Sequence, residues 1–254
     1  MQIVTDTGMD MHLPPELMPE IPIHIVPHTI TLDGKSYRSG EEIQADELQK
    51  MLMASPSFPT TSQPSAGDFA DVYRKLAGTD PDILSIQMSS GLSGTYNSAC
   101  AAAEMVPEAK VTVVDTKTLC AAQGWMVAAA GRAIKAGWPI KKIVALIERI
   151  GAATESIYSL DELKYLIHGG RISHMKGLIA SLLNIRPLIG VEKVGGTYSQ
   201  LGMARTFEKA LQVLVDTMLK YHRPGSALLF TSAFMVSRPI GRILARDAAS
   251  CRPF

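Results

Sequence analysis

Short apolar runs alternate with helical patterns along the first 154 residues, and this alternation restricts the possible folds more than any other feature of the chain. The runs "QIVTD", "DILSIQM" and "KVTVVDT" are typical of strands, and "IPIHIVPHTITL" is extended, with a turn at "DG" before another short strand. Apolar spacing predicts helices over residues 45–54, 66–78, 96–106, 124–137 and 139–154. Strands that alternate with helices indicate βαβ units around a mainly parallel sheet.

The pattern changes near residue 154, where we expect the boundary between two α/β domains, residues 1–154 and 155–254. The second region begins with the short strand "ESIYSL" and a glycine-interrupted helical stretch over residues 163–185. A hairpin over residues 186–204, a helix over 205–222 and a strand "SALLFTSAF" follow. The fold class expected from the sequence is therefore α/β with two domains, the first of which has a mainly parallel sheet.

Charge and cysteine content exclude several classes of protein. The chain has 25 Lys and Arg against 24 Asp and Glu, so it lacks the basic excess of nucleic-acid-binding proteins. Its first residues have no secretory pattern, and its most apolar stretch, "WMVAAAGRAI", is short and interrupted by Arg132. The three cysteines lack metal-ligand spacing, and their odd number fits a reducing compartment. We expect a cytoplasmic protein without a metal.

The stretch "SSGLSGTYNSA", residues 89–99, places hydroxyls and two glycines between an expected strand and an expected helix. Backbone N–H groups and the positive helix end converge at such a point, which suits a phosphate, a sulfate or a carboxylate. Gly91 and Gly94 would let the backbone approach a ligand closely. A serine-rich helix cap explains the same residues without a ligand, and this stretch alone does not decide between the two.

A second hydroxyl-rich stretch, "PTTSQPSAGDF" at residues 59–69, also reads as a loop before an expected helix. Ser65 and Asp68 have the spacing of a capping box, which leaves the hydroxyls of residues 60–62 unused. Neither stretch contains Lys or Arg, so their convergence favours a singly charged carboxylate over a polyphosphate. Neutral donors hold a carboxylate through charge-assisted hydrogen bonds.

Other catalytic and metal-binding motifs fit less well. In "GLSGT", residues 91–95, a threonine stands where the nucleophile elbow of hydrolases has its second glycine. There is no phosphate-binding P-loop and no dinucleotide fingerprint. Asp6 and Asp10 fit a strand-end turn better than a metal site. The histidines at 24, 28, 168, 174 and 222 are scattered and define no catalytic triad by spacing.

Several motifs together resemble the DegV family of bacterial fatty-acid-binding proteins over residues 1 to about 230. In chain order they are "IVTDTGMDM", "TTSQPSAGDF", "SSGLSGTYNSA", "VVDT" and "HGGRIS…LLNIRPLI…ARTFEKA". The resemblance implies the two-domain EDD fold, with a long-chain fatty acid bound between the domains and its acyl chain in an apolar tunnel. Carried over by motif, the carboxylate contacts are Thr61 and Ser93, with Ser62, Gly94 and Thr95 as second contacts. Tunnel candidates on one helical face are Leu178, Leu182 and Ile185.

The resemblance also implies a partner, because members of this family serve as the acyl-carrying subunit of fatty acid kinase. The chain has no nucleotide motif of its own, so we expect a carrier and not an enzyme, with the fatty acid as its ligand and no cofactor. Arg171 and Arg205 resemble the basic positions expected to dock the ATP-binding kinase subunit, although solvated or ion-paired surface arginines would look the same. Two alternatives stay open: a serine hydrolase that uses Ser93, and a regulatory protein that senses a carboxylate.

The end of the sequence departs from the family pattern. Residues 231–254 contain four arginines and no lysine, whereas lysines predominate before them. Family members usually continue through a further helix and strand to a histidine-containing Gly-Pro-Gly motif near the lipid carboxylate. We therefore expect a truncated or frame-shifted terminus, without one edge strand and one carboxylate ligand.

Overall fold

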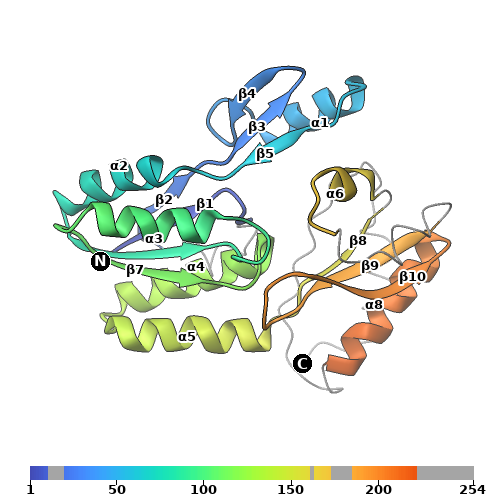
Figure 1. The fold of residues 1–254 in the computed structure, drawn as a ribbon. Coiled ribbons are helices and arrows are strands. Elements are labelled where there is room, and N and C mark those ends of the chain that lie inside the picture. Colours follow the sequence, from blue (N-terminus) through green and yellow to red (C-terminus); the bar gives the residue numbers. More distant parts are fainter. Residues whose placement is uncertain (11–19, 161–162, 173–184, 222–254) are drawn as a thin grey trace.

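The computed structural model describes residues 1–10, 20–160, 163–172 and 185–221 (Figure 1). Four expectations lie wholly or partly outside these residues: the helical stretch over 163–185, of which residues 173–184 are not described, the tunnel candidates Leu178 and Leu182, the strand expected at residues 226–234, and the tail after Thr231.

A four-stranded parallel sheet forms the centre of the first half of the chain. Its strands lie in the order β2 (Ile23–Val26), β1 (Gln2–Asp6), β6 (Asp82–Gln87) and β7 (Lys110–Asp115). All three neighbouring pairs are parallel. The sheet confirms the mainly parallel arrangement expected from the alternating pattern.

Two helices cover each face of this sheet (Figure 1). They are α2 (Ala66–Ala77) and α3 (Thr95–Met105) on one face, and α4 (Cys120–Lys135) and α5 (Ile140–Ala153) on the other. Successive strand residues alternate between the faces: Val4 packs with Phe69 and Tyr73, whereas Ile3 packs with Met126. A strand buried on both faces is mostly apolar, which explains the apolar runs. The exceptions are the buried polar residues of β1 and β6, namely Thr5, Asp6, Ser85 and Gln87. Within the described residues, no helix has the length and apolar character needed to cross a membrane.

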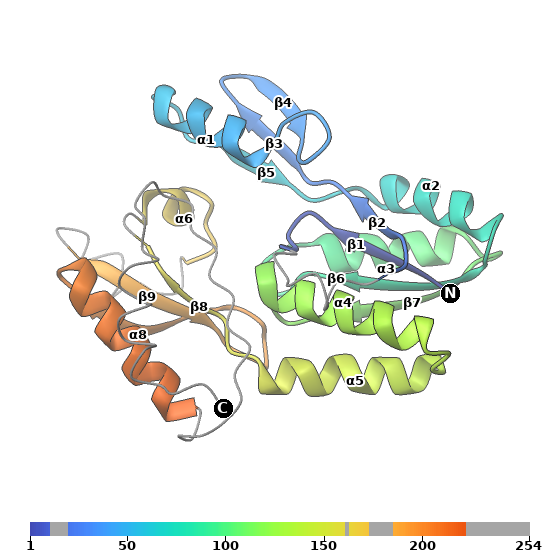
Figure 2. The ribbon, with the colours of Figure 1, turned by 180° about the vertical axis from the view of Figure 1, so that it is seen from behind.

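A separate antiparallel sheet and helix α1 (Ala45–Ala54) stand beyond the parallel sheet (Figures 1 and 2). The strand order is β4 (Lys35–Arg38), β3 (Thr29–Leu32), β5 (Thr60–Ser62). Asp33 and Gly34 both have positive φ, 51° and 75°, as a tight two-residue hairpin turn requires. The expectation of a loop at residues 60–62 was wrong, because this segment pairs with the open edge of β3.

The rest of the described chain forms a second antiparallel sheet. Its strands lie in the order β10 (Tyr198–Ala204), β9 (Arg186–Val191), β8 (Ile157–Ser159), and the hairpin expected over residues 186–204 is confirmed. Helix α8 (Phe207–Tyr221) packs on this sheet, and the short helix α6 (Lys164–His168) lies between β8 and β9 in sequence. The chain passes from one sheet system to the other between α5 and β8, where the sequence suggests the domain boundary.

Candidate functional site

The carboxyl ends of β1 and β6 meet at one edge of the parallel sheet, and the buried Asp6 ties them together. Its Oδ1 accepts a hydrogen bond from Gly8 N (2.6 Å), and its Oδ2 accepts from Met88 N (2.8 Å) and Gln123 Nε2 (3.1 Å). The bond to Gly8 agrees with the strand-end turn expected here. Among the residues that the structure describes, no group of three or more His, Cys, Asp and Glu side chains could hold a metal.

A chain of hydrogen bonds leads from β1 to the first hydroxyl stretch. Ser93 Oγ lies 2.7 Å from Thr95 Oγ1, which lies 3.0 Å from His28 Nε2. His28 Nδ1 in turn lies 2.9 Å from Thr7 Oγ1. Thr95 is fully buried, whereas Thr7, His28 and Ser93 are half-buried, so the middle of the hydrogen-bond chain is shielded and its two ends lie nearer the surface. Ser93 is the end that belongs to the hydroxyl stretch.

His28 and Thr7 are the site residues that sequence reasoning missed. The parallel pairing of β1 with β2 brings residues 7 and 28 together, although 21 positions separate them. Burial lowers the pKa of His28, Asp6 opposes this effect and Arg171 adds to it, so the ring is neutral near pH 7. The only signal in the sequence was position: His28 lies within the extended segment expected over residues 21–32.

The explanation of the hydroxyls as a helix cap fails for α3. Helix α3 begins after Gly94, which has no side chain to cap it. Within the described residues, the one side-chain hydrogen bond to the backbone of its first residue is a long one, from Thr95 N to Ser93 Oγ (3.3 Å). Helix α2, in contrast, has the expected capping box: Ser65 Oγ accepts from Asp68 N, and Asp68 Oδ2 accepts from Ser65 N. The hydroxyls of Ser93 and Thr95 bond mainly to each other and to His28, which leaves Ser93 able to contact a ligand.

The second hydroxyl stretch comes close to the first through its Gln63 side chain. A Cβ built on Gly94 would lie 2.3 Å from Gln63 Nε2, so a larger residue at this position would clash with the Gln63 amide. Thr61 is exposed, and its Oγ1 accepts a long hydrogen bond from Arg171 Nη2 (3.4 Å). The structure therefore brings residues 61–63, residues 93–95 and Arg171 close together. We call this group of residues the hydroxyl edge.

The remaining predicted residues lie further from this edge or make other contacts. Ser62 is exposed and pairs with Thr29 in the β5–β3 ladder. Arg205 follows β10 and is exposed, and within the described residues no hydrogen bond or ion pair connects it to Arg171 or to either hydroxyl stretch. Ile185 is half-buried just before β9.

Gly91 has a different role from the one expected. A Cβ at this position would lie 2.2 Å from Gly195 O, in the turn of the β9–β10 hairpin. The neighbouring Ser89 Oγ donates to Gly196 O at 2.7 Å. The glycine thus allows the second sheet to pack on the hydroxyl stretch, and the space beside it is not left for a ligand.

This contact predicts an unusually high cost for Gly196→Ala. Gly196 has φ +69°, and a Cβ there would lie 2.0 Å from Ser89 Oγ. Gly34 has a similar φ, +75°, with nothing near the added atom, so Gly34→Ala isolates the backbone cost of about 1–2 kcal/mol. Overpacking should add about 1–3 kcal/mol for Gly196→Ala. Urea unfolding measures both free energies, and equal losses would argue against the close contact.

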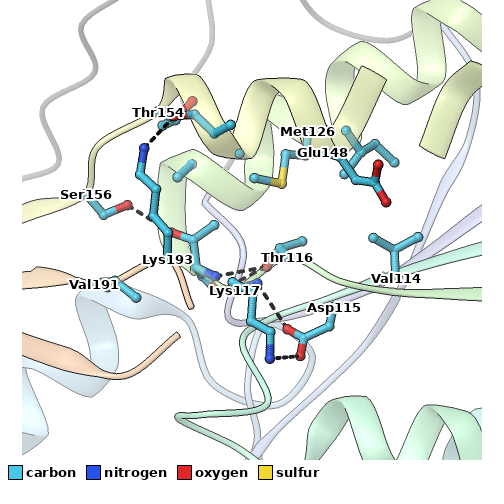
Figure 3. Close-up of a pocket in the computed structure, with 15 residues that line it drawn as sticks. Val114, Asp115, Thr116, Lys117, Met126, Glu148, Thr154, Ser156, Val191 and Lys193 are labelled. Carbon is cyan, nitrogen blue, oxygen red and sulfur yellow. Dashed lines mark hydrogen bonds and ion pairs between the residues drawn. The ribbon is translucent and has the colours of Figure 1, made fainter. Parts of the chain in front are cut away.

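A cavity of about 290 Å³ lies where β7, α4 and α5 meet β9 (Figure 3). Figure 3 shows Lys193 extended toward the end of α5 and Lys117 turned toward Asp115. Lys193 Nζ donates to Ala152 O (2.6 Å) and pairs with Glu155, while Lys117 pairs with Asp115 at 2.9 Å. Both lysines already have partners within the protein, and neither Thr61 nor Ser93 lines the cavity. The cavity lies at the junction of the parallel sheet with the β8–β10 sheet, and it is separate from the hydroxyl edge.

Comparisons with known proteins agree with this fold. The model of a family described as "Uncharacterised protein, DegV family" matches residues 1–229. A DegV domain-containing protein of Listeria monocytogenes is 33% identical over 220 residues, which are 86% of this chain and 76% of the relative. One from Listeria innocua is 35% identical over 188 residues, 74% of this chain and 66% of the relative. The chain thus spans about two thirds to three quarters of these relatives.

Solved structures match over the same region. A fatty-acid-binding DegV family protein from Thermus thermophilus is 32% identical, with a TM-score of 0.75 over 87% of this chain and 77% of that one. A stearic-acid-binding protein from Eubacterium ventriosum is 26% identical, with a TM-score of 0.76 over 87% and 76%. DegV from Bacillus subtilis, a fatty acid binding protein, is 25% identical, with a TM-score of 0.79 over 98% and 88%. The matches confirm the α/β fold class expected from the sequence.

Proposed function

Since this chain belongs to the DegV family, we propose that it binds a long-chain fatty acid between two domains, residues 1–154 and 155–254. The carboxylate lies at the hydroxyl edge, and the acyl chain occupies an apolar tunnel. The observation that supports this proposal most is the hydrogen-bond chain that ends on Ser93, because Thr95 holds the Ser93 hydroxyl through its Oγ1 (2.7 Å) and its N–H (3.3 Å) while Ser93 stays half-buried and able to contact a ligand. Relatives that bind fatty acids share this fold at 25–32% identity.

Each hydroxyl has a distinct part in the proposed site. Thr61 and Ser93 donate to the carboxylate, one from β5 and one from the stretch before α3. Thr95 already bonds to Ser93 and His28, so it orients Ser93 more than it contacts the ligand. The backbone N–H of Gly94 and the hydroxyl of Ser62 are the second contacts. Arg171, within 3.4 Å of Thr61, adds a positive charge that attracts an anion.

Titration of the delipidated protein tests binding directly. The single proposed site should bind one palmitate molecule per protein chain. Each buried methylene contributes roughly 0.8 kcal/mol in palmitate and in hexadecane alike. The charged hydrogen bonds should therefore make palmitate bind far more tightly than hexadecane. Isothermal titration or a fluorescent fatty acid displacement assay gives both affinities. Equal affinities for the acid and the alkane would contradict a carboxylate site.

We further propose that the protein presents its fatty acid to the ATP-binding subunit of a fatty acid kinase. The carboxylate oxygen attacks the γ-phosphorus of ATP on the partner, which yields an acyl phosphate and ADP. Trapping with hydroxylamine detects the acyl phosphate. Arg205→Ala should slow this transfer while palmitate affinity stays unchanged, because among the described residues no hydrogen bond or ion pair joins exposed Arg205 to the hydroxyl edge. Unchanged transfer in that variant would exclude Arg205 as a docking residue, and a carboxylate-sensing regulator would form no acyl phosphate.

The hydroxyl geometry does not favour a serine hydrolase. A nucleophilic serine needs a base within hydrogen-bond distance, whereas Ser93 reaches His28 only through Thr95. We therefore expect no labelling of Ser93 by a fluorophosphonate probe. Labelling that Ser93→Ala abolishes would instead support a hydrolase.

A further inference from the structure

We propose that His28 is a positioning residue of the carboxylate site: its ring sets the direction of donation so that Ser93 presents its proton, and not a lone pair, to the ligand. This inference rests on the proposed function, because it assumes that a carboxylate binds beside Ser93. It goes further in assigning a role to a residue outside both hydroxyl stretches.

A neutral imidazole has one N–H donor and one nitrogen acceptor, so the chain has two possible directions. If Nε2 carries the proton, it donates to Thr95 Oγ1, and Thr95 donates to Ser93 Oγ. The Ser93 proton then points outward. If Nδ1 carries the proton, Nε2 accepts from Thr95, Thr95 accepts from Ser93, and Ser93 presents only lone pairs. These lone pairs would repel a carboxylate.

Thr7 favours the first direction. Its Oγ1 accepts the backbone N–H of His28 at 2.9 Å and lies 2.9 Å from Nδ1 of the same residue. A hydroxyl oxygen has two lone pairs, so its bond to the backbone does not by itself fix the ring. Among the described residues, however, Nδ1 is the hydrogen-bond partner that can accept the Thr7 proton, and a ring that accepts at Nδ1 carries its own proton on Nε2, 3.0 Å from Thr95 Oγ1. The same sequence of donors then continues to Ser93 at 2.7 Å.

The direction of donation along the hydrogen bonds from Thr7 to Ser93 determines which ligand head group the site prefers. A carboxylate only accepts hydrogen bonds, so it needs an outward proton on Ser93. A fatty alcohol of the same length both donates and accepts, so it binds Ser93 in either direction. His28 should therefore matter for palmitate and hardly at all for hexadecanol. Arg171 and Asp6 act on the charged palmitate and hardly on the neutral alcohol. Both are present in the wild type and in a His28 variant alike, so the comparison uses the change in affinity that the variant causes for each ligand.

Nitrogen-15 NMR of the palmitate-loaded wild-type protein tests the direction without any substitution. Two-bond correlations assign the tautomer of His28, and we expect a protonated Nε2 and an unprotonated Nδ1. The opposite tautomer in the loaded protein would overturn the proposal. This measurement stands even where a His28 variant fails to fold.

Binding measurements on His28→Leu test the consequence. Palmitate affinity should fall about tenfold to a hundredfold, as expected for one charge-assisted hydrogen bond, while hexadecanol affinity changes less than about twofold. His28→Gln can donate through its amide and should restore part of the palmitate affinity. Equal losses for both ligands, or no loss for palmitate, would refute the positioning role. If the wild-type protein binds no palmitate, the proposed function itself fails, which is a separate result.

Discussion

Replacing Thr61 and Ser93 together with alanine should lower palmitate affinity about 10²–10⁴-fold. Each side chain donates one hydrogen bond to a charged oxygen, and each such bond contributes about 1.5–3 kcal/mol. Two bonds therefore amount to about 3–6 kcal/mol, and 1.4 kcal/mol corresponds to a factor of ten. Titration of the delipidated variant with palmitate measures the change. The single variants should each show about half of the free-energy loss.

The chain offers a matched control for this double variant. Thr31 and Ser36 are an exposed threonine–serine pair, 2.8 Å apart, on the same antiparallel sheet as Thr61. Their double alanine variant removes the same chemical groups and should leave palmitate affinity unchanged. An affinity of the Thr61/Ser93 variant within threefold of the wild-type value would show that these hydroxyls do not hold the carboxylate.

Asp6→Ala should lower the free energy of unfolding by about 2–6 kcal/mol. The substitution leaves the backbone N–H groups of Gly8 and Met88 without their acceptor, and each buried unsatisfied donor costs about 1–3 kcal/mol. Gln123 also loses a partner for its amide. Urea unfolding followed by circular dichroism measures the loss. Palmitate affinity should fall as well, because Met88 directly precedes the hydroxyl stretch.

An exposed aspartate provides the comparison. Asp71 is 82% exposed and forms a surface ion pair with Arg74 at 3.1 Å, so Asp71→Ala should cost about 1 kcal/mol at most. Asp6→Asn should fall between the two, because one side-chain oxygen remains as an acceptor. A loss below about 1 kcal/mol for Asp6→Ala would mean that water replaces the carboxylate at the strand ends.

Periodic elements were predictable because their pattern lies within the sequence itself. Helix α1 spans the residues expected from its apolar spacing, 45–54, and the capping box at Ser65 and Asp68 is a local motif. Strand β5 was not predictable in this way. A three-residue strand has no period to detect, and its partner β3 lies about 30 residues earlier in the chain. Its formation depends on tertiary pairing.

The residues of the candidate site show the same difference between local motifs and tertiary contacts. The hydroxyls of residues 60–62 and 93–95 were visible because composition and glycine content mark such stretches. His28 was not, since only the pairing of β1 and β2 carries it to Thr7 and Thr95. The close approaches at the two glycines were not predictable either: Gly91 accommodates the β9–β10 hairpin and Gly94 accommodates Gln63. Contacts between distant segments determine those positions.

Mass spectrometry of an organic extract from the purified, denatured protein tests fatty acid binding most directly. The proposed function requires a near-stoichiometric long-chain fatty acid in the wild-type extract and a strongly reduced amount in the extract of the Thr61/Ser93 double alanine variant. An extract without fatty acid, from a protein that also takes up no added palmitate, would contradict it.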